Sequence, residues 1–120
     1  MSEGQITHID LPSDDLPRAV AFYKALFGWQ AANMPEFPGY EVFTTGQDGV
    51  GVGIGLRGET APGQPRIYLT VDSIDEALAK LPELGGSVVV EKTEVPGMGW
   101  YAAIKDTEGS EIGIWENPPG

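Results

Sequence analysis

Two stretches of the chain decide its fold: residues 6–28, ITHIDLPSDDLPRAVAFYKALFG, and residues 64–86, QPRIYLTVDSIDEALAKLPELGG. They align without a gap at a spacing of 58 residues, and the same register runs through the rest of the chain. Fourteen of the 62 aligned pairs are identical. A fixed internal period indicates a duplicated structural unit. We therefore expect one domain, residues 1–120, built from two modules at about 1–58 and 59–120.

Each of the two stretches begins with a strand pattern. Residues 6–11 and 66–71 alternate or run apolar over the length of a strand. An Asp follows in both cases, at Asp14 and Asp72, and a carboxylate there is suited to cap a helix by accepting a backbone N–H. The pattern predicts a strand that leads directly into a helix in each module.

A helix follows each of these strands. Apolar residues recur at three- and four-residue steps until glycine ends the pattern, at Gly28 in the first module and at Gly85 in the second. Pro17 lies in the first turn, where proline is tolerated, whereas Pro82 must shorten or kink the last turn of the second helix.

Three candidate strands, punctuated by Gly and Pro, follow each helix. They cover residues 29–33, 40–45 and 50–57 in the first module and 87–91, 99–105 and 110–116 in the second. The fold class predicted is α+β, with two tandem βαβββ modules. One helix covers one face of four strands, so we expect the two modules to pair as a cupped mixed sheet with a pocket on the uncovered side.

The charge of the chain excludes several partners. Seven basic and eighteen acidic side chains give a formal net charge of −11, which repels phosphate backbones and anionic lipid headgroups. No apolar run approaches the ~20 residues that span a bilayer, and the absence of cysteine suits a reducing compartment. We expect a cytoplasmic protein that binds neither nucleic acid nor membranes.

Several motifs along almost the whole chain resemble one known family. They are Asp15-Leu16, Phe22-Tyr23, Leu26-Phe27-Gly28-Trp29, Val71-Asp72-Ser73-Ile74-Asp75-Glu76-Ala77, Gly85-Gly86, Asp106-Thr107-Glu108-Gly109 and Ile112-Gly113-Ile114-Trp115-Glu116. The chain is similar to the vicinal oxygen chelate superfamily, which includes glyoxalase I, the bleomycin resistance proteins and the extradiol dioxygenases. The resemblance implies a glyoxalase-like fold, and dimers are common in this superfamily, so a homodimer is expected. It is weak evidence for any one reaction.

Metal-dependent members of this superfamily hold an ion with side chains from the first and last strands of each module. The matching positions in this chain are His8, Gly55, Arg66 and Gly113. Arginine stays protonated and cannot donate a lone pair, and glycine has no side chain. One ligand of four remains, so we expect no metal cofactor, with a divalent ion as the less favoured alternative.

Strand alternation predicts which side chains face the pocket. If Ile9 and Leu11 lie under the first helix, then the uncovered face carries His8, Asp10, Arg66 and Tyr68. The candidate aromatic walls, which otherwise pack in the core or at a sheet edge, are Tyr40, Phe43, Trp100, Tyr101 and Trp115. The candidate ligand-binding residues taken from these two sets are His8, Asp10, Arg66, Tyr68, Phe43, Trp100 and Tyr101.

Two of these residues have open roles. His8 is the single histidine and the candidate catalytic residue for proton transfer. Alternatively, it is a vestigial ligand position that is hydrogen-bonded to a neighbour such as Asp10. Arg66 either binds an anionic group of a ligand or neutralises Asp10.

Three functions stay open at this point. The favoured one is metal-independent binding of a small molecule, aromatic or cationic, in the pocket. The second is an enzyme, either a metal-dependent lyase, isomerase or dioxygenase or an acid–base catalyst that uses His8. The third is an interaction module whose exposed sheet pairs with another chain.

Overall fold

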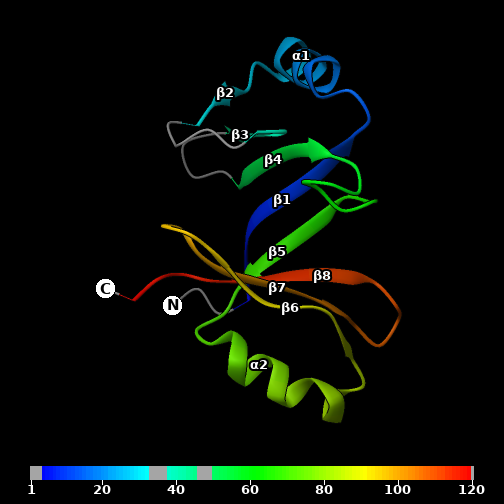
Figure 1. Ribbon diagram of the computed structural model, residues 1–120, viewed down its shortest axis with the longest axis vertical. Coiled ribbons are helices and arrows are strands. Elements are labelled where there is room, and N and C mark those ends of the chain that lie inside the picture. Colours follow the sequence, from blue (N-terminus) through cyan, green and yellow to red (C-terminus); the bar gives the residue numbers. More distant parts are fainter. Residues whose placement is uncertain (1–3, 33–37, 46–49, 120) are drawn as a thin grey trace. The chain divides into compact units, whose positions relative to one another are not determined.

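The computed structural model describes residues 4–32, 38–45 and 50–119 and divides into two compact units (Figure 1). The N-terminal unit contains residues 7–66. The C-terminal unit contains residues 67–120 together with the chain up to Ile6. Within these described residues, each unit has four strands and one α-helix in the order βαβββ, which confirms the predicted α+β class.

The N-terminal unit is a mixed sheet with α1 on one face (Figure 1). Its strands lie in the order β2-β3-β4-β1, in which β1 and β4 are parallel and the other pairs are antiparallel. The elements are β1 (Gln5–Ser13), α1 (Leu16–Phe27), β2 (Gln30–Ala31), β3 (Tyr40–Thr44) and β4 (Gly51–Leu56). The predicted strand over 29–33 is shorter than expected, and residue 33 lies outside the described residues.

The core of the N-terminal unit lies between α1 and the sheet. Phe43, Val52 and Ile54 are buried there, and the expected inward residues Ile9 and Leu11 pack against them. At the end of α1, Trp29 stacks on Tyr23 with ring centroids 5.1 Å apart and an interplanar angle of 4°. Every other residue of β1 and β4 therefore points into this core, as alternation in a strand requires.

Both predicted helix caps were wrong by one residue. Asp15 caps α1, because its carboxylate accepts a hydrogen bond from the backbone N–H of Arg18 at 3.0 Å. Ser73 caps α2 in the same way through Glu76 at 3.1 Å. The helices begin at equivalent positions, Leu16 and Ile74, so the capping position comes one residue later than the Asp that the repeat preserves.

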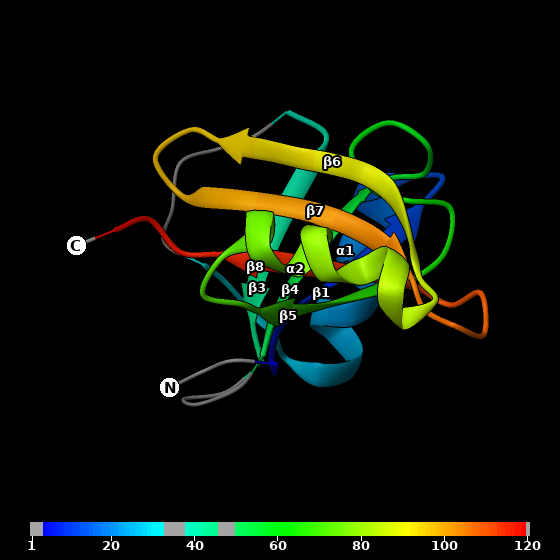
Figure 2. The same ribbon diagram turned by 90° about the horizontal axis from the view of Figure 1, so that it is seen from below.

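The C-terminal unit repeats the arrangement, with α2 along one face of its sheet (Figures 1 and 2). The strands lie in the order β5-β8-β7-β6, with β5 and β8 parallel. The elements are β5 (Arg66–Thr70), α2 (Ile74–Lys80), a 3₁₀ turn (Leu81–Leu84), β6 (Ser87–Val95), β7 (Gly99–Lys105) and β8 (Glu111–Glu116).

Pro82 shortens α2 as predicted. The α-helix ends at Lys80, and the chain continues as a 3₁₀ turn that Gly85 closes with a φ of 92°. Strand β6 is longer than the predicted 87–91, and its register against β7 shifts twice between Val88 and Thr93. Such shifts are β-bulges, which a sequence pattern of period two does not indicate.

The core of the C-terminal unit contains Ile74, Ala102 and Ile114, all buried. Trp100 and Ile104 pack against them from β7.

In neither unit, within the part of the chain that the structure describes, is a helix long and apolar enough to cross a membrane.

Candidate functional site

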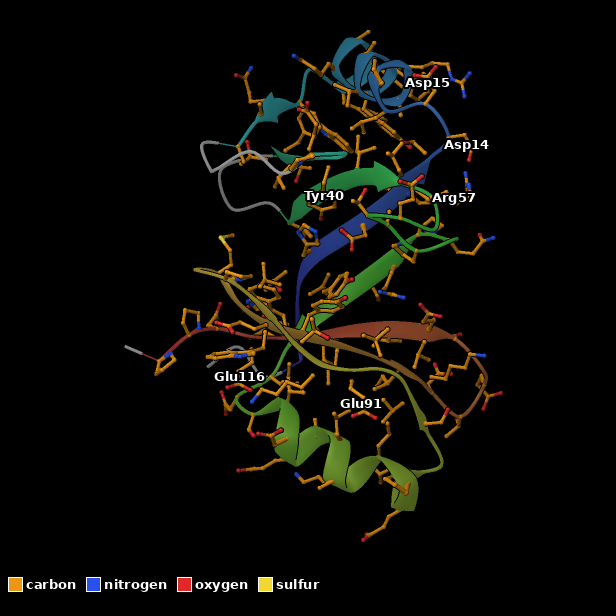
Figure 3. The ribbon with its side chains drawn as sticks, viewed as in Figure 1. Asp14, Asp15, Tyr40, Arg57, Glu91 and Glu116 are labelled. Carbon is orange, nitrogen blue, oxygen red and sulfur yellow. The ribbon has the colours of Figure 1, made fainter. Side chains whose placement is uncertain are left out.

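Three polar side chains meet on the face of the N-terminal sheet that lies opposite α1. His8 and Asp10 come from β1. Tyr40, which is labelled in Figure 3, comes from β3. His8 Nε2 lies 2.9 Å from Asp10 Oδ1 and 2.8 Å from the Tyr40 hydroxyl oxygen. The Tyr40 hydroxyl in turn donates to Asp10 Oδ1. The side chains of His8 and Asp10 are 28% and 11% exposed, so the cluster is partly shielded from water.

Glycines on β4 make room for this cluster. A Cβ on Gly53 would lie 1.7 Å from the Tyr40 hydroxyl oxygen, so glycine is required for Tyr40 to cross the strand there. A Cβ on Gly51 would lie 3.4 Å from His8 Nδ1. The alternation of glycine with aliphatic residues in β4 thus follows from its two faces: the aliphatic side chains enter the core, and the glycines lie under the cluster.

Strand alternation placed His8 and Asp10 together, whereas Tyr40 was predicted only as an aromatic wall and not as their hydrogen-bonding partner. The sequence feature that could have indicated a bulky partner for this face is Gly53, because a glycine on one face of a strand leaves room for a bulky neighbouring side chain. Gly53 and Tyr40 are far apart in the sequence, so their contact could not be predicted from a local pattern. It depends on the β3–β4 register, in which Tyr40 is aligned with Gly55.

The corresponding face of the C-terminal unit is aromatic. The ring centroids of Tyr68 and Tyr101 are 6.3 Å apart, and the rings meet edge to face at 66°. A Cβ on Gly113 would lie 2.3 Å from the Tyr68 ring, so Tyr68 fills the space that a side chain at position 113 would take. Trp115 shares this parity on β8 and donates a hydrogen bond from Nε1 to Asn117 Oδ1 at 2.9 Å.

Two predicted binding residues have other surroundings. Phe43, 1% exposed, lies in the core under α1, and Trp100 packs in the core on the α2 side, where Lys92 Nζ lies 5.2 Å from its ring centroid. Both belong to the alternate set of their strands, whose side chains point toward the helix. Arg66, by contrast, is buried at the start of β5, two residues before Tyr68 and therefore on the same face of that strand.

Comparison with known proteins decides the family. Residues 5–114 match the model of the Glyoxalase/Bleomycin resistance protein/Dioxygenase superfamily. The chain belongs to this superfamily.

Relatives and solved structures agree with this superfamily assignment. CFP32 of Mycobacterium tuberculosis, named provisionally as a glyoxylase, is 30% identical over 121 residues, which cover 97% of this chain and 45% of that protein. The chain thus spans about half the length of that curated relative. The hypothetical protein BH1468 from Bacillus halodurans has a similar fold, with a TM-score of 0.74, 16% identity and coverage of 98% and 96% of the two chains. Methylmalonyl-CoA epimerase from Mycobacterium tuberculosis gives a TM-score of 0.68 at 17% identity, with coverage of 97% and 89%.

The residues at the superfamily's metal positions do not fit an ion. A Cβ on Gly55 would lie 2.9 Å from the carbonyl carbon, the carbonyl oxygen and Oγ1 of Thr60, just as Tyr68 occupies the space beside Gly113. His8 Nε2 is engaged by two oxygens, and the Arg66 guanidinium has no lone pair to give. Among the described residues, no group of three or more His, Asp or Glu is placed to hold a metal ion.

Proposed function

We propose that this member of the superfamily binds a small molecule without a metal ion. The observation that carries the proposal is what surrounds the residues at the superfamily's metal-ligand positions in this chain. Thr60 fills the space beside Gly55 and Tyr68 fills that beside Gly113, while Asp10 and Tyr40 engage His8. A divalent ion needs several His or carboxylate donors at about 2 Å. Polar and aromatic contacts are what these faces offer a ligand instead.

The ligand class that we propose is a small aromatic cation. Tyr101 and Trp115 are half-buried and supply aromatic surface, with Tyr68 packed edge to face against Tyr101, and the faces of such rings attract positive charge. The formal net charge of −11 raises the local concentration of cations around the protein.

The absence of a metal requirement is tested by titration. Protein purified without a His tag should contain no stoichiometric metal, and Zn²⁺, Ni²⁺, Mn²⁺ or Fe²⁺ should leave its melting temperature unchanged. A metal that copurifies at one equivalent, or one that stabilises the wild type but not His8→Ala, would overturn this part of the proposal.

The ligand class is tested by thermal shift with matched compounds. Aromatic cations should stabilise the protein, by about 2.7 kcal/mol at a concentration 100 times Kd, and neutral isosteres of the same shape should stabilise it less. Tyr101→Leu should weaken the shift. Phe22→Leu, a change to an aromatic residue that is 56% exposed on α1, should not. Stabilisation by neutral or anionic compounds alone contradicts a cationic ligand.

A further inference from the structure

The outer side of α1 is apolar, although it lies at the surface of the N-terminal unit (Figure 1). Phe22, Leu26 and Phe27 are 56%, 60% and 58% exposed there. The inner side of the same helix is apolar as well, because it packs in the core. A helix at a protein surface normally combines one apolar stripe with a polar face, and a helix that is apolar all round is normally buried. The composition of α1 is therefore that of a helix with a second neighbour.

The internal repeat shows that the βαβββ module itself does not require an apolar outer side on its helix. At the spacing of 58 residues, Phe22 and Ala25 of α1 correspond to Lys80 and Glu83 of the C-terminal unit. Both of these residues are charged and exposed, as is usual for the outer side of a surface helix. The same place in the fold is therefore polar in one unit and apolar in the other.

A groove with a volume of about 670 Å³ lies along α1. Among the described residues, its apolar walls include Pro17, Ala21 and Ala25, and its two charged groups are Lys24 of α1 and Glu41 of β3. Ala21 and Ala25 are four residues apart and share one side of the helix, where small side chains let another element approach closely. Both charged groups are exposed. The groove thus combines room for an apolar group with one charge of each sign.

We propose that a second copy of this chain covers the groove and the outer side of α1. Two identical chains related by a two-fold axis present the same surface to each other, so each contact between two different residues occurs twice, once in each direction. A groove with one Lys and one Glu meets this requirement, because Lys24 of each copy can pair with Glu41 of the other. The exposed Phe22 and Leu26 beside the groove supply apolar surface that the contact buries.

Net charge also favours α1 as the place of contact. Each chain has a formal net charge of −11, so two copies repel each other over most of their surface. Helix α1 contains Arg18 and Lys24 and no acidic residue, whereas α2 and its 3₁₀ turn contain three acidic residues and one basic residue. Of the two helix faces, that of α1 is therefore the one at which two acidic chains meet with less repulsion. The contact does not depend on the ligand proposed above, because α1 lies on the opposite face of its sheet from the His8 cluster.

The contact is tested by sedimentation velocity on the full chain, in a concentration series up to about 1 mM. The wild type should form a reversible dimer. Ala21→Glu should raise the dimer Kd at least about tenfold, because it places a carboxylate in the groove that the other copy fills. The matched control is Ala79→Glu, the same substitution at the exposed position of α2 that corresponds to Ala21, and it should leave the Kd unchanged.

Two outcomes of this experiment overturn the proposal. A wild type that stays monomeric throughout the series shows that a second copy is not the occupant, and a different partner then covers this face. A dimer that Ala21→Glu and Ala79→Glu weaken equally shows that the chains meet elsewhere. Circular dichroism and the melting temperature establish that each variant is folded before its Kd is compared.

The exchanged charge pairs are tested by mixing two variants. In a dimer of Lys24→Glu or of Glu41→Lys, both pairs join like charges, so each variant alone should dimerise at least about tenfold more weakly than the wild type. An equimolar mixture of the two should dimerise with a Kd close to that of the wild type, because both pairs then join opposite charges. Lys24 and Glu41 that pair within one chain would gain nothing from mixing, and a mixture no better than its components overturns the proposed contact.

Discussion

At the scale of single residues, Gly53 determines where Tyr40 can lie. Gly53→Ala should destabilise the fold by about 1–3 kcal/mol, because the new methyl group displaces a hydroxyl that is bonded to Asp10 and His8. This cost exceeds the gain of about 0.4–1 kcal/mol from a stiffer unfolded chain. Urea denaturation measures the difference. Gly63→Ala is the matched control, since nothing lies within 4 Å of its added methyl group, and equal effects at both sites would contradict the packing argument.

The Asp14–Arg57 pair gives a second prediction at this scale. A hydrogen bond from Arg57, at 2.9 Å, and the charge of Arg57 lower the pKa of Asp14 (Figure 3). Because the folded-state pKa is the lower one, the pair stabilises the fold above the unfolded-state pKa, and this contribution is lost as the pH falls through the folded-state value.

Arg57→Ala should therefore raise the pKa of Asp14 toward its ordinary value, as read from the carboxyl carbon in an NMR titration. Arg18→Ala is the control, because Arg18 acts on the Asp14 pKa more weakly, through charge alone. An Asp14 pKa that responds more to Arg18→Ala than to Arg57→Ala would contradict this assignment.

Single residues also show which parts of the candidate site could be predicted from the sequence and which could not. His8 and Asp10 lie two apart on one strand, so alternation was enough to place them together. Tyr40 reaches them from β3, and its place depends on a strand register that no local pattern encodes. Phe43 lies three residues further along β3, and this odd spacing puts it on the opposite face from Tyr40.

At the scale of elements, two adjacent carboxylates at the start of α1 have different roles: Asp15 caps the helix, and Asp14 pairs with Arg57. Asp15→Ala should destabilise the protein by about 1 kcal/mol, because the backbone N–H of Arg18 loses its acceptor. Asp14→Ala removes the same charge but breaks an exposed ion pair with Arg57, and solvent screening leaves such a pair with a smaller effect on stability. Chemical denaturation of the two variants compares them directly. A larger loss for Asp14→Ala would restore the capping position predicted from the sequence.

The elements themselves were largely predictable from the sequence. Apolar spacing and a closing glycine indicated the helix that is observed as α1 at Leu16–Phe27, and Pro82 indicated that α2 would be shortened or kinked at its end, where the structure has a 3₁₀ turn. The far end of β6 was missed because its two bulges break the alternation on which a strand prediction depends. Local sequence patterns were therefore sufficient to predict the helices, whereas the end of β6 depends on its pairing with the neighbouring strand.

At the scale of the whole molecule, the charge of −11 predicts a response to salt. Raising NaCl from 0.01 to 0.15 M shortens the screening length from about 30 to about 8 Å. Repulsion among the acidic groups should weaken and the melting temperature should rise. Exposed pairs such as Lys92–Asp75 weaken as well, but each contributes at most about 1 kcal/mol. KCl should act like NaCl, and a melting temperature that falls in both salts would contradict the prediction.

The three tryptophans are divided between the two units: Trp29 stacks at the end of α1, whereas Trp100 and Trp115 belong to the C-terminal sheet. Each half of the duplication therefore has its own fluorophore. A chain that keeps Trp29 alone reports the melting of the first half, and a Trp29→Phe chain reports the second. Coincident curves would show that the two halves unfold as one cooperative unit, and separate curves would show that each half unfolds independently of the other.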